Sequence, residues 1–150
     1  RKRERMQDFP HIIKAERETL PAFIRSHKRG VTRQVETVGA VLFRGFDIDS
    51  AEKLDDVVNA YGEPGFTYEK SLSNAVRINL TPRVFTANEA PPDVTIFMHH
   101  EMAQTPIYPS KLFFGCLLAP ETGGATPICR ASSHLDAQRH HLSPGLRPGN

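Results

Sequence analysis

The stretch "VGAVLFRGFDIDSAEKLDDVVNAYG", residues 38–62, carries the two clearest secondary-structure signals in the chain. Residues 38–46 are a nearly continuous apolar run of strand length that ends around Gly45, which predicts a buried strand. Apolar side chains then recur at helical spacing up to Gly62, and Asp49 and Glu52 have the spacing of a capping box. A strand followed by a helix is therefore expected at the centre of the fold.

A further helix is predicted upstream, over residues 19–30. Thr19 is a suitable N-cap, Pro21 stands in the first turn, and Gly30 is expected to end the helix. The two predicted helices therefore flank the predicted strand in the sequence.

Downstream of residue 62 the hydrophobic period changes from helical to extended. The predicted strands cover residues 75–80, 83–88 and 111–120, and a last one begins near Thr126 after a Gly123-Gly124 turn. Few helices and many late strands predict an α+β, mainly β fold with a mainly antiparallel sheet, rather than a doubly wound parallel sheet.

Composition limits the possible functions. With 39% hydrophobic and 24% charged residues, residues 1–150 read as a single soluble globular domain or a part of one. The net charge of +2 and the lack of a continuous basic stripe argue against a nucleic-acid partner. No apolar segment approaches the roughly 18 residues of a membrane span, so no membrane partner is expected and a cytoplasmic location is the default.

The cysteines and the two ends of the chain allow two further predictions. Cys116 and Cys129 lack the spacing of a zinc site and are interpreted as reduced thiols. The chain begins at Arg1 rather than Met, and residues 131–150 read as an irregular tail rich in proline and glycine near its end. The sequence is therefore interpreted as a fragment or a natural truncation.

The most chemically specific segment is "MHHEM", residues 98–102. In an extended segment His99 and Glu101 point to one face and His100 to the other. An imidazole and a carboxylate on one face supply two corners of the 2-His-1-carboxylate triad that suits non-haem Fe(II). Such a pair also occurs by chance in a chain with seven histidines, and a surface ion pair is the alternative. The apolar surroundings favour the metal, because a buried carboxylate is costly unless it is paired or bound to a cation.

Three segments together resemble the TauD/TfdA-like Fe(II)/2-oxoglutarate-dependent dioxygenases. They are "GAVLFRGFDI" (39–48), "VFTANEAPPDVTIFMHHEMAQTPIYPSKLFF" (84–114) and "PETGGATPI" (120–128). The resemblance covers about residues 10–130 and is strongest to the branch of hydroxylases associated with nonribosomal peptide assembly. It implies a double-stranded β-helix (jelly roll, clavaminate synthase-like), incomplete at the C-terminus, of which residues 1–150 would be the N-terminal portion.

The resemblance also assigns roles to single residues. His99 matches the first iron-binding histidine, Glu101 the carboxylate ligand, and Thr126 the threonine that hydrogen-bonds 2-oxoglutarate. Without the resemblance, Thr126 reads as a β-branched residue that begins a strand. Asn88 and Glu89 are candidates for the substrate side of the site, with an ordinary polar loop as the alternative.

The family's second iron-binding histidine and its 2-oxoglutarate-binding arginine lie far beyond the first motif, and no residue of this chain matches them. The late candidates are predicted instead to lie on a solvated helix; they are His134, His140, His141, Arg139 and Arg147. His100 stands where relatives have asparagine and is expected to support the site or the fold rather than to bind the metal.

The implied function is hydroxylation of an unactivated C–H bond, with Fe(II) as cofactor and 2-oxoglutarate and dioxygen as co-substrates. The substrate would be small and amino-acid-like or tethered to a carrier, and 2-oxoglutarate would be decarboxylated to succinate. The alternative is a truncated, non-catalytic remnant that acts as a binding or interaction module. A third reading is a structural zinc or other metal site at His99 and Glu101.

Overall fold

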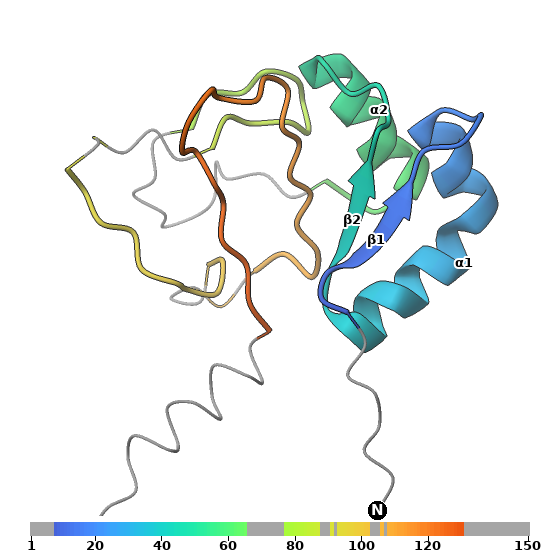
Figure 1. Cartoon of the computed structure of the whole chain (residues 1–150), viewed down its shortest axis with the longest axis horizontal. Helices are drawn as coiled ribbons and strands as arrows, with labels where there is room; N and C mark the ends of the chain where they lie inside the picture. The colour runs from blue at the N-terminus through green and yellow to red at the C-terminus, as the bar shows by residue number, and fades with distance from the viewer. Residues whose placement is uncertain are drawn as a thin grey trace, which may run out of the picture.

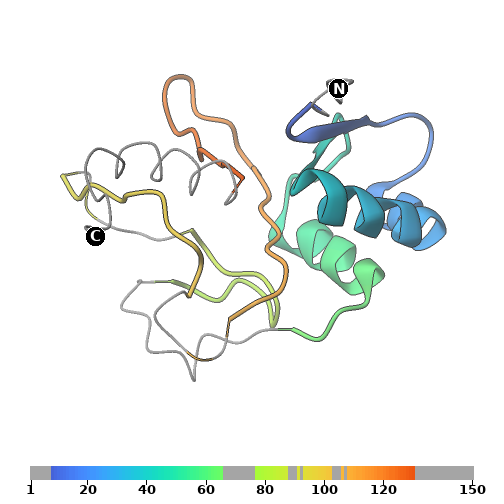
Figure 2. The same ribbon diagram turned by 90° about the horizontal axis from the view of Figure 1, so that it is seen from below.

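The computed structural model describes residues 8–65, 77–87, 91, 93–102, 106 and 108–130. Its four regular elements are β1 (His11–Lys14), α1 (Leu20–Val38), β2 (Val41–Arg44) and α2 (Ala51–Tyr61). Figure 2 shows both helices on the same side of the two strands, and α1 packs against both β2 and α2. Later segments of the chain lie beside this layered unit (Figure 1).

The sheet differs from the expected antiparallel arrangement. β1 and β2 pair in parallel, with His11 opposite Val41 and Lys14 opposite Arg44. A parallel pair needs a crossover connection, and α1, which lies between the two strands in the sequence, provides it. β2 confirms the strand predicted around residues 38–46, whereas β1 was missed because its four residues, "HIIK", are too few for a clear period.

The strands expected in the second half are not formed within the described residues. Residues 77–87 contain an isolated antiparallel bridge between Asn79 and Phe85, and residues 108–130 contain no strand. A strand is stable only when a neighbour takes up its backbone hydrogen bonds, and no such neighbour lies along residues 111–120 in the described part of the chain. The large apolar side chains of Phe114 and Leu118 are consequently exposed.

Helix α1 begins as predicted but ends later. The Thr19 side chain caps it by accepting a hydrogen bond from the Ala22 N–H at 3.4 Å. The helix continues through Gly30 to Val38 and ends at Gly39, whose φ of 98° is left-handed. Gly30 fails to end the helix because Val31 and Val38 beyond it are buried, which outweighs the low helix propensity of one glycine.

We expect Gly30→Ala to raise the free energy of unfolding by about 1 kcal/mol, because alanine has the higher helix propensity. Nothing lies within 4 Å of the position that the new Cβ would take. Gly39→Ala is the matched control and is expected to destabilise the protein, since alanine disfavours a left-handed backbone. Urea denaturation followed by circular dichroism measures both; a Gly30→Ala variant less stable than wild type would contradict the prediction.

Helix α2 has the predicted span but a different cap. Ser50, not Asp49, is the N-cap, and its side chain accepts from the Lys53 N–H at 3.2 Å. Asp49 instead lies 2.9 Å from Lys53 Nζ, and this hydrogen bond lowers the pKa of the Asp49 carboxyl. The capping box expected between Asp49 and Glu52 is therefore wrong. Ser50 directly precedes the first helical residue, and its hydroxyl accepts the Lys53 N–H. Gly62 ends the helix with a φ of 73°, as predicted.

Buried side chains of the two helices form the core: Leu20, Ile24, Val31, Val57 and Tyr61. The Tyr61 hydroxyl is 2.6 Å from Thr32 Oγ1, and its ring meets Phe113 at 5.4 Å between centroids. Tyr61 thereby joins both helices to residues 108–130.

Residues 77–87 are tied to α2 by a second set of contacts. Arg83 donates to both carboxylate oxygens of Asp55, at 3.0 and 2.7 Å, and Thr81 Oγ1 donates to Asp55 Oδ1 at 3.1 Å. A two-pronged arginine–carboxylate pair fixes orientation as well as distance. The start of the second half is thus anchored on the helical layer.

Two expectations from composition can be compared with this structure. Cys116 and Cys129 are unpaired and exposed, in agreement with the prediction of free thiols. Within the part of the chain that is described, the helices are too short or too polar to span a membrane.

Candidate metal centre

His99 and Glu101 lie together on a segment that runs away from the helical layer. In both Figure 1 and Figure 2, residues 93–102 lie on the side of the structure away from α1 and α2. His99 Nε2 is 3.9 Å from Glu101 Oε2. The Glu101 side chain is 15% exposed and that of His99 is 58% exposed, so the carboxylate is set back while the imidazole borders solvent.

The backbone that brings the pair together is a turn rather than the expected strand. Residues 94–100 have no regular secondary structure, and Glu101 and Met102 form a turn. Met102 has a φ of 59°, an unfavourable conformation for a residue with a side chain, yet its side chain is buried. Burial of the Met102 side chain offsets part of that strain.

The imidazole of His99 is oriented by its own backbone. Its Nδ1 lies 2.7 Å from the Phe97 carbonyl oxygen. A carbonyl only accepts hydrogen bonds, so Nδ1 carries the proton and donates it. The lone pair of the neutral ring is then on Nε2, the atom that faces Glu101, and a second-nitrogen hydrogen bond of this kind is typical of metal-binding histidines.

Glu101 has a cationic neighbour from another part of the chain. Arg77 Nη2 donates to Glu101 Oε1 at 3.2 Å, and the two side chains are 19% and 15% exposed. The two carboxylate oxygens therefore face different groups: Oε1 faces Arg77, and Oε2 faces His99.

The donor atoms fit a divalent metal ion. Nε2 and Oε2 both carry electron pairs, so a cation between them, either a proton or a metal, stabilises their approach. Two donors in adjacent positions at about 2.1 Å from one ion lie about 3.0–3.4 Å apart, so the 3.9 Å separation would have to shorten by about 0.5–1 Å for both atoms to bind the same ion. Within the described ranges no cluster of three His, Cys, Asp or Glu side chains that could hold a metal ion occurs.

His100 is directed to other groups. Its Nδ1 lies 3.1 Å from the Glu101 carbonyl oxygen, and its ring meets Tyr108 edge-on with centroids 5.9 Å apart. These contacts belong to the turn and to the following segment.

Thr126 is exposed, and among the described residues no hydrogen bond joins it to His99 or Glu101. Gly123 and Gly124 before it have φ values of 70° and 65°, which only glycine adopts readily. A Cβ on Gly124 would come within 2.6 Å of Pro120 Cγ, so Gly124 also permits a close approach of the chain to itself.

The other predicted site residues lie outside the described part of the chain. They are Asn88 and Glu89, and the late candidates His134, His140, His141, Arg139 and Arg147.

Sequence reasoning missed Arg77. It lies within a segment predicted as a strand, and its partner is 24 positions away in the sequence. The available signal was indirect: a carboxylate in an apolar stretch needs a cation, and Arg77 is a charged residue within the alternating run "AVRINL".

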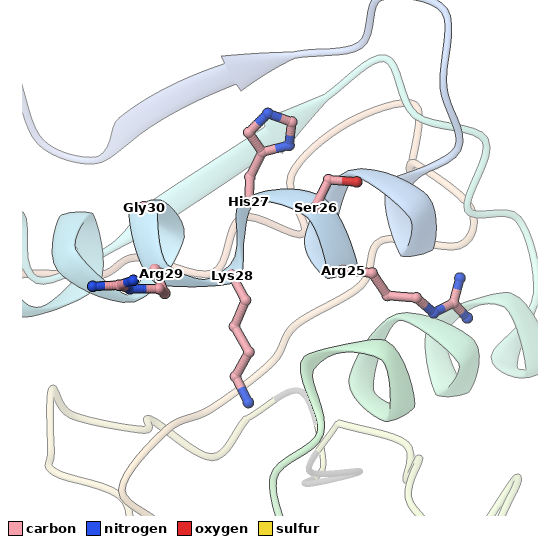
Figure 3. A pocket seen from close by; sticks show the side chains of 6 residues that line it. All are labelled: Arg25, Ser26, His27, Lys28, Arg29 and Gly30. Carbon is pink, nitrogen blue, oxygen red and sulfur yellow. The ribbon is translucent and has the colours of Figure 1, made fainter.

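A shallow hollow elsewhere is lined by consecutive residues of α1, from Arg25 to Gly30. Figure 3 shows that His27 and Lys28 point to opposite sides of the helix. The His27 ring stacks on Phe23, and Lys28 Nζ lies 5.2 Å from the centre of the Tyr61 ring. The hollow is thus the surface of one helix and shares no residue with the His99–Glu101 pair.

Comparisons with known proteins show what the chain is similar to. Residues 5–140 match the family described as "Taurine catabolism dioxygenase TauD, TfdA family". A clavaminate synthase-like protein of Arabidopsis thaliana is 47% identical over 124 residues, which are 81% of this chain and 36% of that protein. Dapdiamide synthesis protein DdaC of Enterobacter agglomerans is 33% identical over 97 residues, 65% of this chain and 29% of that protein. The chain thus spans about a third of the length of these relatives.

Proposed function

The chain belongs to the taurine catabolism dioxygenase TauD, TfdA family, and from this premise we propose that it carries the N-terminal part of an Fe(II)- and 2-oxoglutarate-dependent oxygenase. The observation that supports the proposal most directly is the approach of His99 Nε2 and Glu101 Oε2 to 3.9 Å. Family membership implies a double-stranded β-helix, and the described residues show two helices and a two-stranded parallel sheet.

In this proposal His99 and Glu101 are two of the metal ligands. His99 presents the Nε2 lone pair, because the Phe97 carbonyl holds the proton on Nδ1. Glu101 presents Oε2 and adds a negative charge, which favours binding of a doubly charged metal ion. When bound, Fe(II) together with 2-oxoglutarate and dioxygen supplies the oxidation of an unactivated C–H bond, with release of succinate.

The side chains of Glu101 and His99 have different surroundings, and both suit a metal site. The carboxylate is mostly buried and held by Arg77, so its position is defined before a metal arrives. The imidazole edge borders solvent, where a metal and small ligands can enter. Thr126 is proposed to hydrogen-bond the 2-oxoglutarate carboxylate, through a hydroxyl that follows the Gly123-Gly124 bend.

The proposed substrate is small and amino-acid-like, or an aminoacyl group tethered to a carrier. The name of the Enterobacter relative connects that protein with the synthesis of dapdiamide, an amide by its name, and an amino-acid-derived substrate is compatible with such a product. Asn88 and Glu89 are the proposed contacts on the substrate side of the metal.

The proposal is tested by anaerobic Fe(II) titration of the protein, followed by measurement of succinate formed from 2-oxoglutarate in air. The assay uses both this chain and a version extended to the length of its relatives. We expect the extended protein to bind Fe(II) and to form succinate only when 2-oxoglutarate is present. Metal uptake without succinate would favour a structural metal site, and a folded protein that binds no metal would favour an interaction module; either result would overturn the oxygenase.

A further inference from the structure

Arg77 connects the candidate metal centre to the helical layer. It stands at the start of residues 77–87, which are anchored on α2 through the pair of Arg83 with Asp55 and through Thr81. From there it reaches Glu101, 24 positions later in the sequence, with 3.2 Å between Nη2 and Oε1. The guanidinium of Arg77 is thus held by residues 77–87, whereas the proposed ligands lie on a separate segment that ends in the turn at Glu101 and Met102.

This contact distinguishes the two oxygens of Glu101. A glutamate side chain rotates about several bonds, and an unrestrained carboxylate presents either oxygen in many directions. With Oε1 engaged by the guanidinium, Oε2 is the oxygen that faces His99 Nε2 at 3.9 Å. Both Arg77 and Glu101 are mostly buried, so the contact is screened by water less than a surface ion pair would be.

We propose that Arg77 is a positioning residue for this centre: it holds Glu101 Oε1 so that Oε2 is directed at the metal beside His99. The proposal rests on the oxygenase function proposed above, since it assigns Arg77 a role toward the same metal. Removing a group that hydrogen-bonds a metal ligand and orients it typically lowers the metal affinity by about 10- to 100-fold.

A purely electrostatic role for Arg77 predicts the opposite sign. A guanidinium near the centre repels a dication, so its removal would tighten metal binding if charge alone mattered. Positioning predicts weaker binding, because the carboxylate must be ordered at the moment of binding. The direction of the change in affinity therefore separates the two roles.

The test titrates the protein, extended to the length of its relatives, with Co(II), an air-stable probe for the iron site whose visible absorption reports its ligands. Wild type is compared with Arg77→Gln, Arg77→Lys and Lys111→Gln. Arg77→Gln is expected to weaken Co(II) binding by about 10- to 100-fold and to shift the absorption bands. Arg77→Lys keeps the charge but not the planar fork, so its affinity should lie between those of Arg77→Gln and wild type.

Lys111→Gln is the matched control, because it breaks a partly buried cation–carboxylate pair, Lys111 with Glu63, that lies outside residues 77–87 and touches no proposed ligand. It is expected to lower stability and to leave the Co(II) affinity and spectrum unchanged. If Arg77→Gln binds Co(II) as tightly as wild type or more tightly, the positioning role of Arg77 is overturned and the metal centre is not. A wild type that binds no Co(II) would overturn the metal centre and the role of Arg77 with it. If Arg77→Gln does not fold, Arg77→Lys decides, and wild-type affinity in that variant overturns the proposal.

Discussion

Replacing Glu101 with alanine is expected to lower the affinity for Fe(II) by more than about 100-fold and to abolish succinate formation, because groups that only orient a ligand already account for about 10- to 100-fold. The substitution removes one of the two donors that the structure brings to 3.9 Å. It also removes the hydrogen bond and ion pair between Arg77 Nη2 and Glu101 Oε1, so some loss of stability is expected as well. Anaerobic Fe(II) titration measures the first effect and succinate assays of the extended protein measure the second.

Two neighbouring histidines provide the control for this prediction. His99→Ala is expected to have the same effect as Glu101→Ala, since it removes the other donor. His100→Ala changes an adjacent residue of the same type whose ring contacts Tyr108, and it is expected to retain metal uptake. Glu101→Asp keeps the carboxylate on a shorter side chain and should retain part of the affinity. Loss of metal binding in His100→Ala, or its retention in His99→Ala, would reverse the assignment of ligands.

The proposed ligand pair was predictable because its signal is local. His99 and Glu101 are two positions apart, so a segment without helical structure brings their side chains to one side, whether it is a strand or the observed turn. The expected strand itself is absent there, and the segment ends in a turn in which Met102 has a φ of 59°. Arg77 could not be found in the same way, because its approach to Glu101 depends on how residues 77–87 are anchored on α2.

The same distinction between local and distant interactions explains which features of the fold were predicted. The caps at Thr19 and Gly62 depend on neighbouring residues, and both were predicted from the sequence. The apolar run of β2 was predicted too, but not its pairing with β1. The continuation of α1 past Gly30 depends on packing against α2, and the pairing of β1 depends on a strand beyond the crossover. Strand-like patterns after residue 77 specify which faces are apolar but not which partner takes up the backbone hydrogen bonds.

The largest effect on stability is expected at Ile24, at the contact between α1 and α2. Its side chain is 1% exposed and belongs to the core cluster that includes Val57 and Tyr61. Ile24→Ala removes three carbon atoms from this packed site and should lower the free energy of unfolding by about 2–5 kcal/mol. Because the total stability of a domain is typically about 5–15 kcal/mol, the loss is a large fraction of it.

The matched control is Ile12→Ala, which makes the same chemical change on β1 where the side chain is 52% exposed. Its expected effect is within about 1 kcal/mol, since little apolar surface returns to water. Urea denaturation at equal protein concentration measures both variants, and an unchanged m-value would show that the same transition is compared. Equal losses in the two variants would mean that the α1–α2 contact does not form the core. Co(II) affinity of Ile24→Ala, measured where it is still folded, should equal that of wild type, because the proposed ligands make no contact with Ile24.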